Sequence, residues 1–156
     1  MSMTGKKISA ASAAAGEIVN TRVFTVSREK VFAAFADPAV LARWWGPQGF
    51  TNEFHEFDFR VGGVWRFTMR GPDGASYAMD HRFVDVLAPE RVAVRHLQPG
   101  HDFLLTVSLA VHDGGTELTW RQRFDDAAEG ERLRGFLTAA NAENLDRLAA
   151  QLAQKS

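Results

Sequence analysis

A series of turns between residues 51 and 124 constrains this chain more than any other feature, because it divides the segment into six strand-like runs. Within each run apolar side chains recur at every second position, the period of a strand with one buried face. The length of a hairpin loop sets which residues pair across it. The turn sequences are Gly62-Gly63, Pro72-Asp73-Gly74, Ala88-Pro89-Glu90-Arg91, Pro99-Gly100 and Asp113-Gly114.

These turns predict a register for an antiparallel meander. The pairs expected across them are Met69 with Tyr77, Leu87 with Val92, Gln98 with His101, and His112 with Gly115. In this register Phe83 lies opposite His96, and His81 lies diagonally near His96.

The predicted register assigns each side chain to a face of the sheet, because side chains alternate along a strand. The face rich in arginine should meet water. The other face is mostly apolar and should be covered, and it carries Trp65, Phe67, Met69, Tyr77, Met79, His81, Phe83, Asp85, Leu87, Val92, Val94, His96, Phe103, Leu105, Val107, Leu109, Val111, Leu118, Trp120, Gln122 and Phe124.

Helical patterns flank the meander on both sides. Residues 17–25 read as a strand, Ser27 as the N-cap of a short helix, and Asp37-Pro38 as the start of a second one that stops at Gly46-Pro47. A long helix is predicted from Glu129 to about Ala153, with an inward stripe of Leu133, Phe136, Leu137, Ala140, Asn144, Leu145, Leu148 and Leu152. The prediction is an α+β fold in which a curved, seven-stranded antiparallel sheet wraps around the C-terminal helix.

Length and charge limit the classes of function. The 156 residues suit one domain, predicted over 17–156 after a flexible leader over 1–16. The net charge is −1, so neither nucleic acid nor a membrane is an expected partner. The chain has no cysteine, which fits a reducing compartment, and we expect a cytoplasmic protein.

Several motifs follow one another in a characteristic order. They are Arg22-Val23-Phe24, Val31-Phe32-Ala33-Ala34-Phe35-Ala36-Asp37-Pro38, Leu41-Ala42-Arg43-Trp44-Trp45-Gly46-Pro47, Asp58-Phe59-Arg60-Val61-Gly62-Gly63-Val64-Trp65, Gly71-Pro72-Asp73-Gly74, Pro89-Glu90-Arg91-Val92, Gly115-Thr116 and Asn144-Leu145-Asp146-Arg147-Leu148.

Together these motifs resemble the activator of heat-shock-protein-90 ATPase homologue family, within the SRPBCC (START-like, Bet v 1-like) superfamily, over residues 17–153. The resemblance implies a helix-grip fold with an internal pocket. The chain departs from the family where it has Ala140-Asn141 in place of Gly-Trp and His81 in place of Gly, and the bulkier histidine should change the cavity. The eukaryotic chaperone activators carry a further N-terminal domain, which argues against a chaperone partner here.

Polar side chains on the covered face are the candidates for a site. Five of them (Tyr77, His81, Asp85, His96 and Gln122) need partners, because a buried unpaired polar group costs about 1–3 kcal/mol. Those partners could be one another, solvent at the edge of the sheet, or a ligand, and His or Asp could also do acid–base chemistry. The predicted cavity residues are Trp65, Met69, Tyr77, His81, Asp85, His96, Trp120, Gln122 and Asn144.

The resulting hypothesis is a binding protein for a small hydrophobic molecule. Two alternatives stay open, a cyclase- or hydratase-like enzyme acting on a polyketide-like substrate and an interaction module for a chaperone. No catalytic residue is assigned, and neither a cofactor nor a metal is predicted, since the five histidines show no ligand-type spacing. A homodimer is compatible with the sequence. Trp44-Trp45-Gly46-Pro47 could form a cavity lid or only cement the short helices to the sheet.

Overall fold

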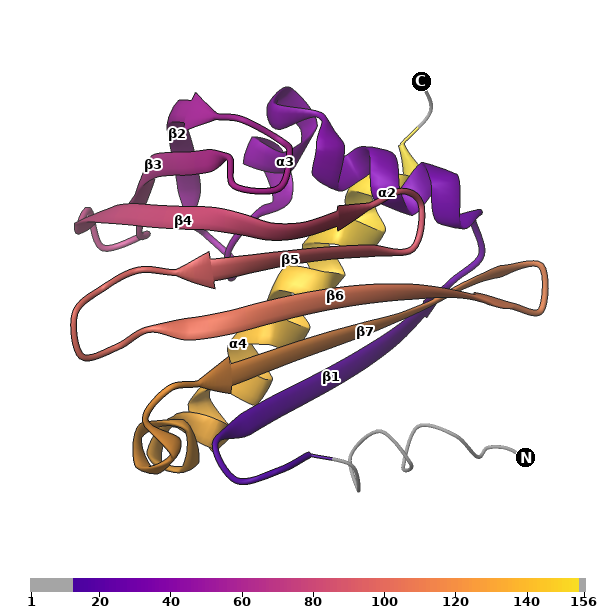
Figure 1. The fold of residues 1–156 in the computed structure, drawn as a ribbon. Helices are drawn as coiled ribbons and strands as arrows, with labels where there is room; N and C mark the ends of the chain where they lie inside the picture. The colour runs from indigo at the N-terminus through magenta and orange to yellow at the C-terminus, as the bar shows by residue number, and fades with distance from the viewer. Residues whose placement is uncertain (1–12, 155–156) are drawn as a thin grey trace.

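One long helix lies diagonally across one face of a seven-stranded antiparallel sheet in the computed structural model, which describes residues 13–154 (Figure 1). The strand order is β1-β7-β6-β5-β4-β3-β2, so the first strand joins the meander beside the last. The elements are β1 (Glu17–Phe24), α2 (Arg28–Ala36), α3 (Pro38–Trp44), β2 (Thr51–Phe57), β3 (Val64–Arg70), β4 (Ser76–Leu87), β5 (Arg91–His96), β6 (Phe103–His112), β7 (Gly115–Phe124) and α4 (Ala127–Ala153). The predicted α+β helix-grip arrangement is confirmed.

The helices begin where side-chain caps are available. Ser27 accepts a hydrogen bond from the backbone N–H of Lys30 at 3.2 Å, as predicted for an N-cap. Asp37 caps α3 in the same way through the N–H of Ala39 at 3.0 Å. The long helix begins two residues before the predicted Glu129, because Asp126 supplies its cap. Residues 1–12 of the predicted leader lie outside the described residues.

Three of the predicted hairpin pairings are confirmed. Met69 pairs with Tyr77 and His112 with Gly115. At the turn between β5 and β6, the N–H of His101 donates to the carbonyl of Gln98 at 2.7 Å. These turns carry glycine in the left-handed region, including Gly74 at φ 88°, so local chemistry alone defines their register.

The fourth pairing was predicted wrongly. Leu87 pairs with Arg91 rather than Val92, and a bulge between Phe83 and Asp85 shifts the register further along β4. His81 therefore lies directly opposite His96. An extra residue in one strand leaves no signature in the turn, so the turn sequence could not reveal it.

The bulge also reverses the faces at the end of β4. Asp85 was predicted to point into the cavity, but it forms an ion pair with Arg91 at 2.6 Å, where both side chains are more than a third exposed. Leu87 is exposed as well, whereas Val86 packs against the core. The prediction was wrong because side-chain alternation continues across a bulge with opposite parity.

Other apolar side chains predicted to be covered lie beyond the reach of the helix. Tyr77 and Val111 sit near strand ends and are 46% and 68% exposed. On α4, Phe136 is 72% exposed, so its predicted place on the inward stripe is wrong. The helix instead buries Asn141 together with Asn144, Leu145 and Leu148.

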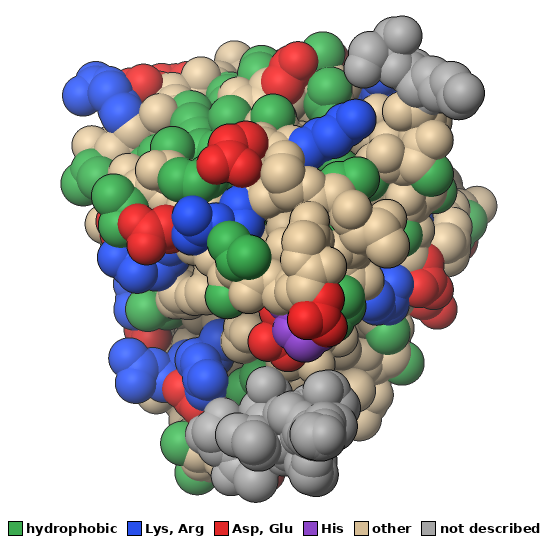
Figure 2. Space-filling view, turned by 90° about the vertical axis from the view of Figure 1, so that its right-hand side faces the viewer, with side chains coloured by type: hydrophobic (Ala, Val, Ile, Leu, Met, Phe, Trp, Pro, Cys, Tyr) green, Lys and Arg blue, Asp and Glu red, His purple; other side chains and the backbone are tan. Residues whose placement is uncertain are grey.

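The opposite face of the sheet is rich in arginine and was predicted to meet water; Arg66 and Arg70 on it are exposed and form ion pairs. Arg66 pairs with Glu56 and Arg70 with Glu53, each at 3.2 Å across neighbouring strands. Exposed pairs of this kind add little stability. Viewed from the end of the sheet, basic and acidic side chains are interspersed, so this side shows no broad field of one sign (Figure 2).

Candidate functional site

An open pocket of about 230 Å³ lies between the inner face of the sheet, the segment that follows α3, and the middle of α4. Its wall combines aromatic and aliphatic side chains with three amides and one histidine, and none of the described lining residues is charged. The lining residues are Trp45, Gly46, Pro47, Phe50, Met69, Met79, His81, Phe103, Leu105, Trp120, Gln122, Phe136, Leu137, Ala140, Asn141 and Asn144.

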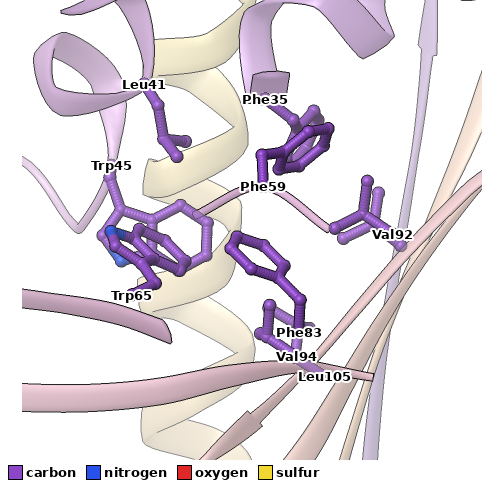
Figure 3. A pocket seen from close by; sticks show the side chains of 10 residues that line it. Phe35, Leu41, Trp45, Phe59, Trp65, Phe83, Val92, Val94 and Leu105 are labelled. Atoms are coloured by element: carbon purple, nitrogen blue, oxygen red, sulfur yellow. The ribbon is translucent and has the colours of Figure 1, made fainter. Parts of the chain in front are cut away.

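The interior beside this pocket is closed by aromatic packing (Figure 3). The rings of Trp45 and Trp65 lie with centroids 5.0 Å apart, and Phe83 stacks on Trp65. Only about 10 Å³ remains free there, on the order of one water molecule. Trp45 and Leu105 line both spaces and form the partition between them.

The two tryptophans at the C-terminal end of α3 have different roles. Trp44 is 1% exposed, its indole N–H donates to the carbonyl of Ala34 at 3.1 Å, and its ring meets Phe35 edge-on. Trp44 therefore packs α3 against α2. Trp45 is also buried, but it reaches the pocket wall, with its ring centroid 5.4 Å from that of Trp120.

A single arginine holds the segment that forms one wall of the pocket. The guanidinium of Arg147 on α4 donates to the carbonyls of Trp45, Gly46 and Pro47 at 2.9–3.1 Å, and to that of Arg43 at 2.8 Å. These carbonyls lie in the last turn of α3 or just beyond it, where backbone acceptors lack intrahelical donors. Burial lowers the pKa of Arg147. The sequence pattern placed this residue off the inward stripe and missed its role.

Asn144 secures the same segment from inside the molecule. It is 5% exposed, and its Oδ1 accepts a hydrogen bond from the N–H of Gly46 at 3.1 Å. This amide was predicted on the inward stripe of the helix, and it is buried there with a backbone N–H as its partner. Because Asn144 also lines the pocket, it takes part in both the packing network and the cavity wall.

A chain of amides crosses from β1 to the pocket floor. Asn20 Nδ2 donates to the carbonyl of Thr138 at 3.1 Å, and Asn141 Nδ2 lies 3.3 Å from Asn20 Oδ1. The same Asn141 nitrogen donates to Gln122 Oε1 at 3.1 Å. Asn141 was not among the predicted site residues, although its place one turn before Asn144 on the helix was the available signal.

The two histidines on the inner face form a buried pair. His81 Nε2 lies 3.3 Å from His96 Nδ1, and His96 Nε2 lies 3.3 Å from Gln98 Oε1. Burial and, secondarily, the neighbouring His96 lower the pKa of His81 to about 3, against a backbone contact with Trp65 that acts in the opposite direction. Burial is also the main cause that lowers the pKa of His96. Both rings are therefore neutral at physiological pH.

A second, more open groove adjoins the pocket. It shares Phe103, Gln122 and Leu137 with the pocket and encloses about 320 Å³. His96 lines this groove rather than the pocket, and at its far end His101 contacts the buried carboxylate of Glu129.

The predicted cavity residues are thus only partly brought together. Met69, His81, Trp120, Gln122 and Asn144 line the pocket. The other four do not: Trp65 lines the closed apolar space, His96 the adjoining groove, and Tyr77 and Asp85 neither.

Within residues 13–154, no group of three or more His, Asp or Glu side chains is placed to hold a metal ion. Over the same residues, no helix has the length and apolar character needed to cross a bilayer.

One family model and several solved structures match this chain. The family model described as Activator of Hsp90 ATPase homolog 1-like protein matches residues 25–154. Among curated proteins, none matches the chain.

Solved structures with 25–28% identity share the fold along nearly the whole chain. Protein CV1439 from Chromobacterium violaceum is 28% identical, with a TM-score of 0.77 over 90% of this chain and 99% of its own. A Rhodobacter sphaeroides protein is 25% identical, with a TM-score of 0.81 over 90% and 95%. A Silicibacter pomeroyi protein named for the same family is 25% identical, with a TM-score of 0.72 over 88% and 97%.

Proposed function

Because this chain belongs to the Activator of Hsp90 ATPase homolog 1-like family of the SRPBCC (Bet v 1-like) superfamily, we propose that it binds a small hydrophobic molecule between its sheet and α4. One observation carries the proposal, namely the pocket of about 230 Å³ with aromatic walls and three amides. Concave, mostly apolar surfaces with a few polar groups are typical of small-molecule sites.

The packing around the pocket favours an open binding site over a collapsed core. The Arg147 and Asn144 hydrogen bonds hold the Trp45–Pro47 wall in place without filling the space beside it. A wall held by hydrogen bonds within the protein is preorganised, which reduces the entropy lost on binding.

The neutral fluorophore N-phenyl-1-naphthylamine tests the proposal directly. Saturable fluorescence enhancement and a raised melting temperature are expected, because a ligand selective for the folded state stabilises it by mass action. Ala140→Phe should abolish both effects by filling the pocket. Ala139→Phe is the matched control, since Ala139 is exposed on the same helix and should leave binding intact. Absence of saturable binding to the wild-type protein would overturn the proposal.

Acid–base catalysis has less support from the geometry. His81 is the one titratable side chain among the described lining residues. Its Nε2 faces His96, and its Nδ1 is buried without a hydrogen-bond partner in the described part of the chain. A catalytic base must reach the proton that it removes, but one ring nitrogen of His81 contacts His96 and the other is fully buried. Binding without chemistry therefore fits the site better.

The small molecule is the partner that we propose for this protein, in a cytoplasmic setting that suits a chain without cysteine. A chaperone partner is a weaker proposal. It predicts that the purified protein retains a chaperone from native lysate at physiological salt, and recovery of none would count against it.

A further inference from the structure

We infer that the ligand is an uncharged molecule that carries a carbonyl oxygen on a flat hydrophobic skeleton. This inference rests on the proposed function and adds the chemical class of the ligand. It follows from the direction in which each amide of the pocket must point.

The orientation of Gln122 follows from a chain of neighbours. The carbonyl of Thr138 can only accept, so the Asn20 atom beside it is the nitrogen, which leaves Asn20 Oδ1 as an acceptor. The Asn141 atom near that oxygen must then be its nitrogen. The Gln122 atom that meets the same nitrogen is therefore Oε1, so the Gln122 NH₂ group remains as a donor.

The orientation of Asn144 follows from one neighbour. The backbone N–H of Gly46 can only donate, so the atom 3.1 Å away is Asn144 Oδ1 and the NH₂ group remains. Within residues 13–154, neither the Gln122 nor the Asn144 nitrogen has a hydrogen-bond partner, and neither is among the fully buried atoms that lack one. Both donors therefore keep access to open space, and the residues that carry them line the pocket.

The absence of charge in the described lining limits the chemical class of the ligand further. The described lining holds no Lys, Arg, Asp or Glu, and His81 stays neutral because its buried ring has a pKa of about 3. A carboxylate or an ammonium group placed here would lose its hydration without gaining a counter-ion. Two NH₂ donors match a carbonyl oxygen, which has two lone pairs, and Asn141 Oδ1 can accept from a hydroxyl on the same ligand.

The aromatic wall supplies the shape. Trp45 and Trp120 lie with ring centroids 5.4 Å apart and an interplanar angle of 33°, and Phe103 and Phe50 also line the pocket. Flat ring faces of this kind pack best against a planar partner. The expected ligand is thus a neutral aromatic or conjugated ketone, ester or amide.

Three naphthalene probes that share one skeleton test the inference by calorimetric titration at neutral pH. They are 2-acetylnaphthalene, 2-ethylnaphthalene and 2-naphthoate. The ketone should bind about 3- to 10-fold tighter than the hydrocarbon, the range for one net hydrogen bond, and the carboxylate should bind most weakly. Gln122→Met removes one of the two donors and should reduce the preference for the ketone, whereas Gln151→Met, outside the pocket, should keep it in full.

The outcomes separate the two proposals. Equal binding of ketone and hydrocarbon, or tightest binding of the carboxylate, overturns the inference and leaves hydrophobic binding intact. Failure of all three probes, together with failure of N-phenyl-1-naphthylamine, overturns the proposed function itself. The wild-type ranking decides the matter even if Gln122→Met does not fold.

Discussion

His81 Nε2 lies 3.3 Å from His96 Nδ1 across the β4–β5 pair, in a setting where His81 is 2% exposed. The ring of His81 also stacks parallel to that of Phe67, with centroids 5.5 Å apart. An aromatic, desolvated setting of this kind favours the neutral ring, which makes the protein sensitive to acid.

Stability should fall with acid because of this pair. In the unfolded chain His81 takes up a proton near its ordinary pKa of 6.5, whereas in the folded protein it does so only near 3. The unfolded state therefore binds more protons between these values, and the contribution of His81, fully present above pH 6.5, is lost as pH falls. At about 1.4 kcal/mol per pH unit, the loss reaches about 3 kcal/mol by about pH 4.5.

Urea unfolding at about pH 7.5 and 4.5 measures this loss. His81→Phe should show a smaller drop between the two values than the wild type. The exposed His55 provides the control, because His55→Gln should keep the full drop. An unchanged drop in His81→Phe would contradict the assignment to His81.

Arg147→Lys should destabilise the protein by about 1–3 kcal/mol. Lysine keeps the charge, but its compact ammonium cannot serve the four carbonyls that the guanidinium now holds. Arg132→Lys, at an exposed position of the same helix, should change stability by less than about 0.5 kcal/mol. Chemical unfolding measures the free energy of unfolding of both variants. Equal losses of stability would show that the contacts of Arg147 with the carbonyls do not stabilise the fold.

Asn144→Leu should lower stability by about 1–3 kcal/mol, because it strands the buried N–H of Gly46. Glu143, the preceding residue, makes a comparable contact with the N–H of Gln48, but at the surface. Glu143→Ala should therefore cost less than about 0.5 kcal/mol. Unfolding free energies of the two variants decide the matter. A stability equal to or above the wild type for Asn144→Leu would instead assign Asn144 mainly to the pocket.

Phe136→Ala should weaken binding of N-phenyl-1-naphthylamine without lowering stability. The side chain is 72% exposed yet lines the mouth of the pocket, so its loss leaves no internal cavity. Leu145→Ala, at 1% exposure on the same helix, should cost about 2–5 kcal/mol. Thermal melts and probe titrations of the two variants should thus give opposite patterns. A large stability loss in Phe136→Ala would show that Phe136 packs into the core.

The sequence by itself determined the order of elements, the caps at Ser27 and Asp37, and the pairings at the glycine turns such as Met69 with Tyr77. These features depend on residues that are neighbours along the chain, so local chemistry is enough to predict them. The alternation of apolar residues likewise predicted most of the covered face.

Only the tertiary structure decided which polar groups meet. The bulge in β4 moved Asp85 outward and brought His81 opposite His96, and no local signal announces an extra residue within a strand. The Arg147 hydrogen bonds to the Trp45–Pro47 segment and the amide orientations of Gln122 and Asn144 depend on partners about 20 to 100 residues away in the chain. A hydrogen bond forms only when the distance and angle between its atoms are right, and these depend on the three-dimensional structure. Helical periodicity fixes a side chain's direction only to within about one position.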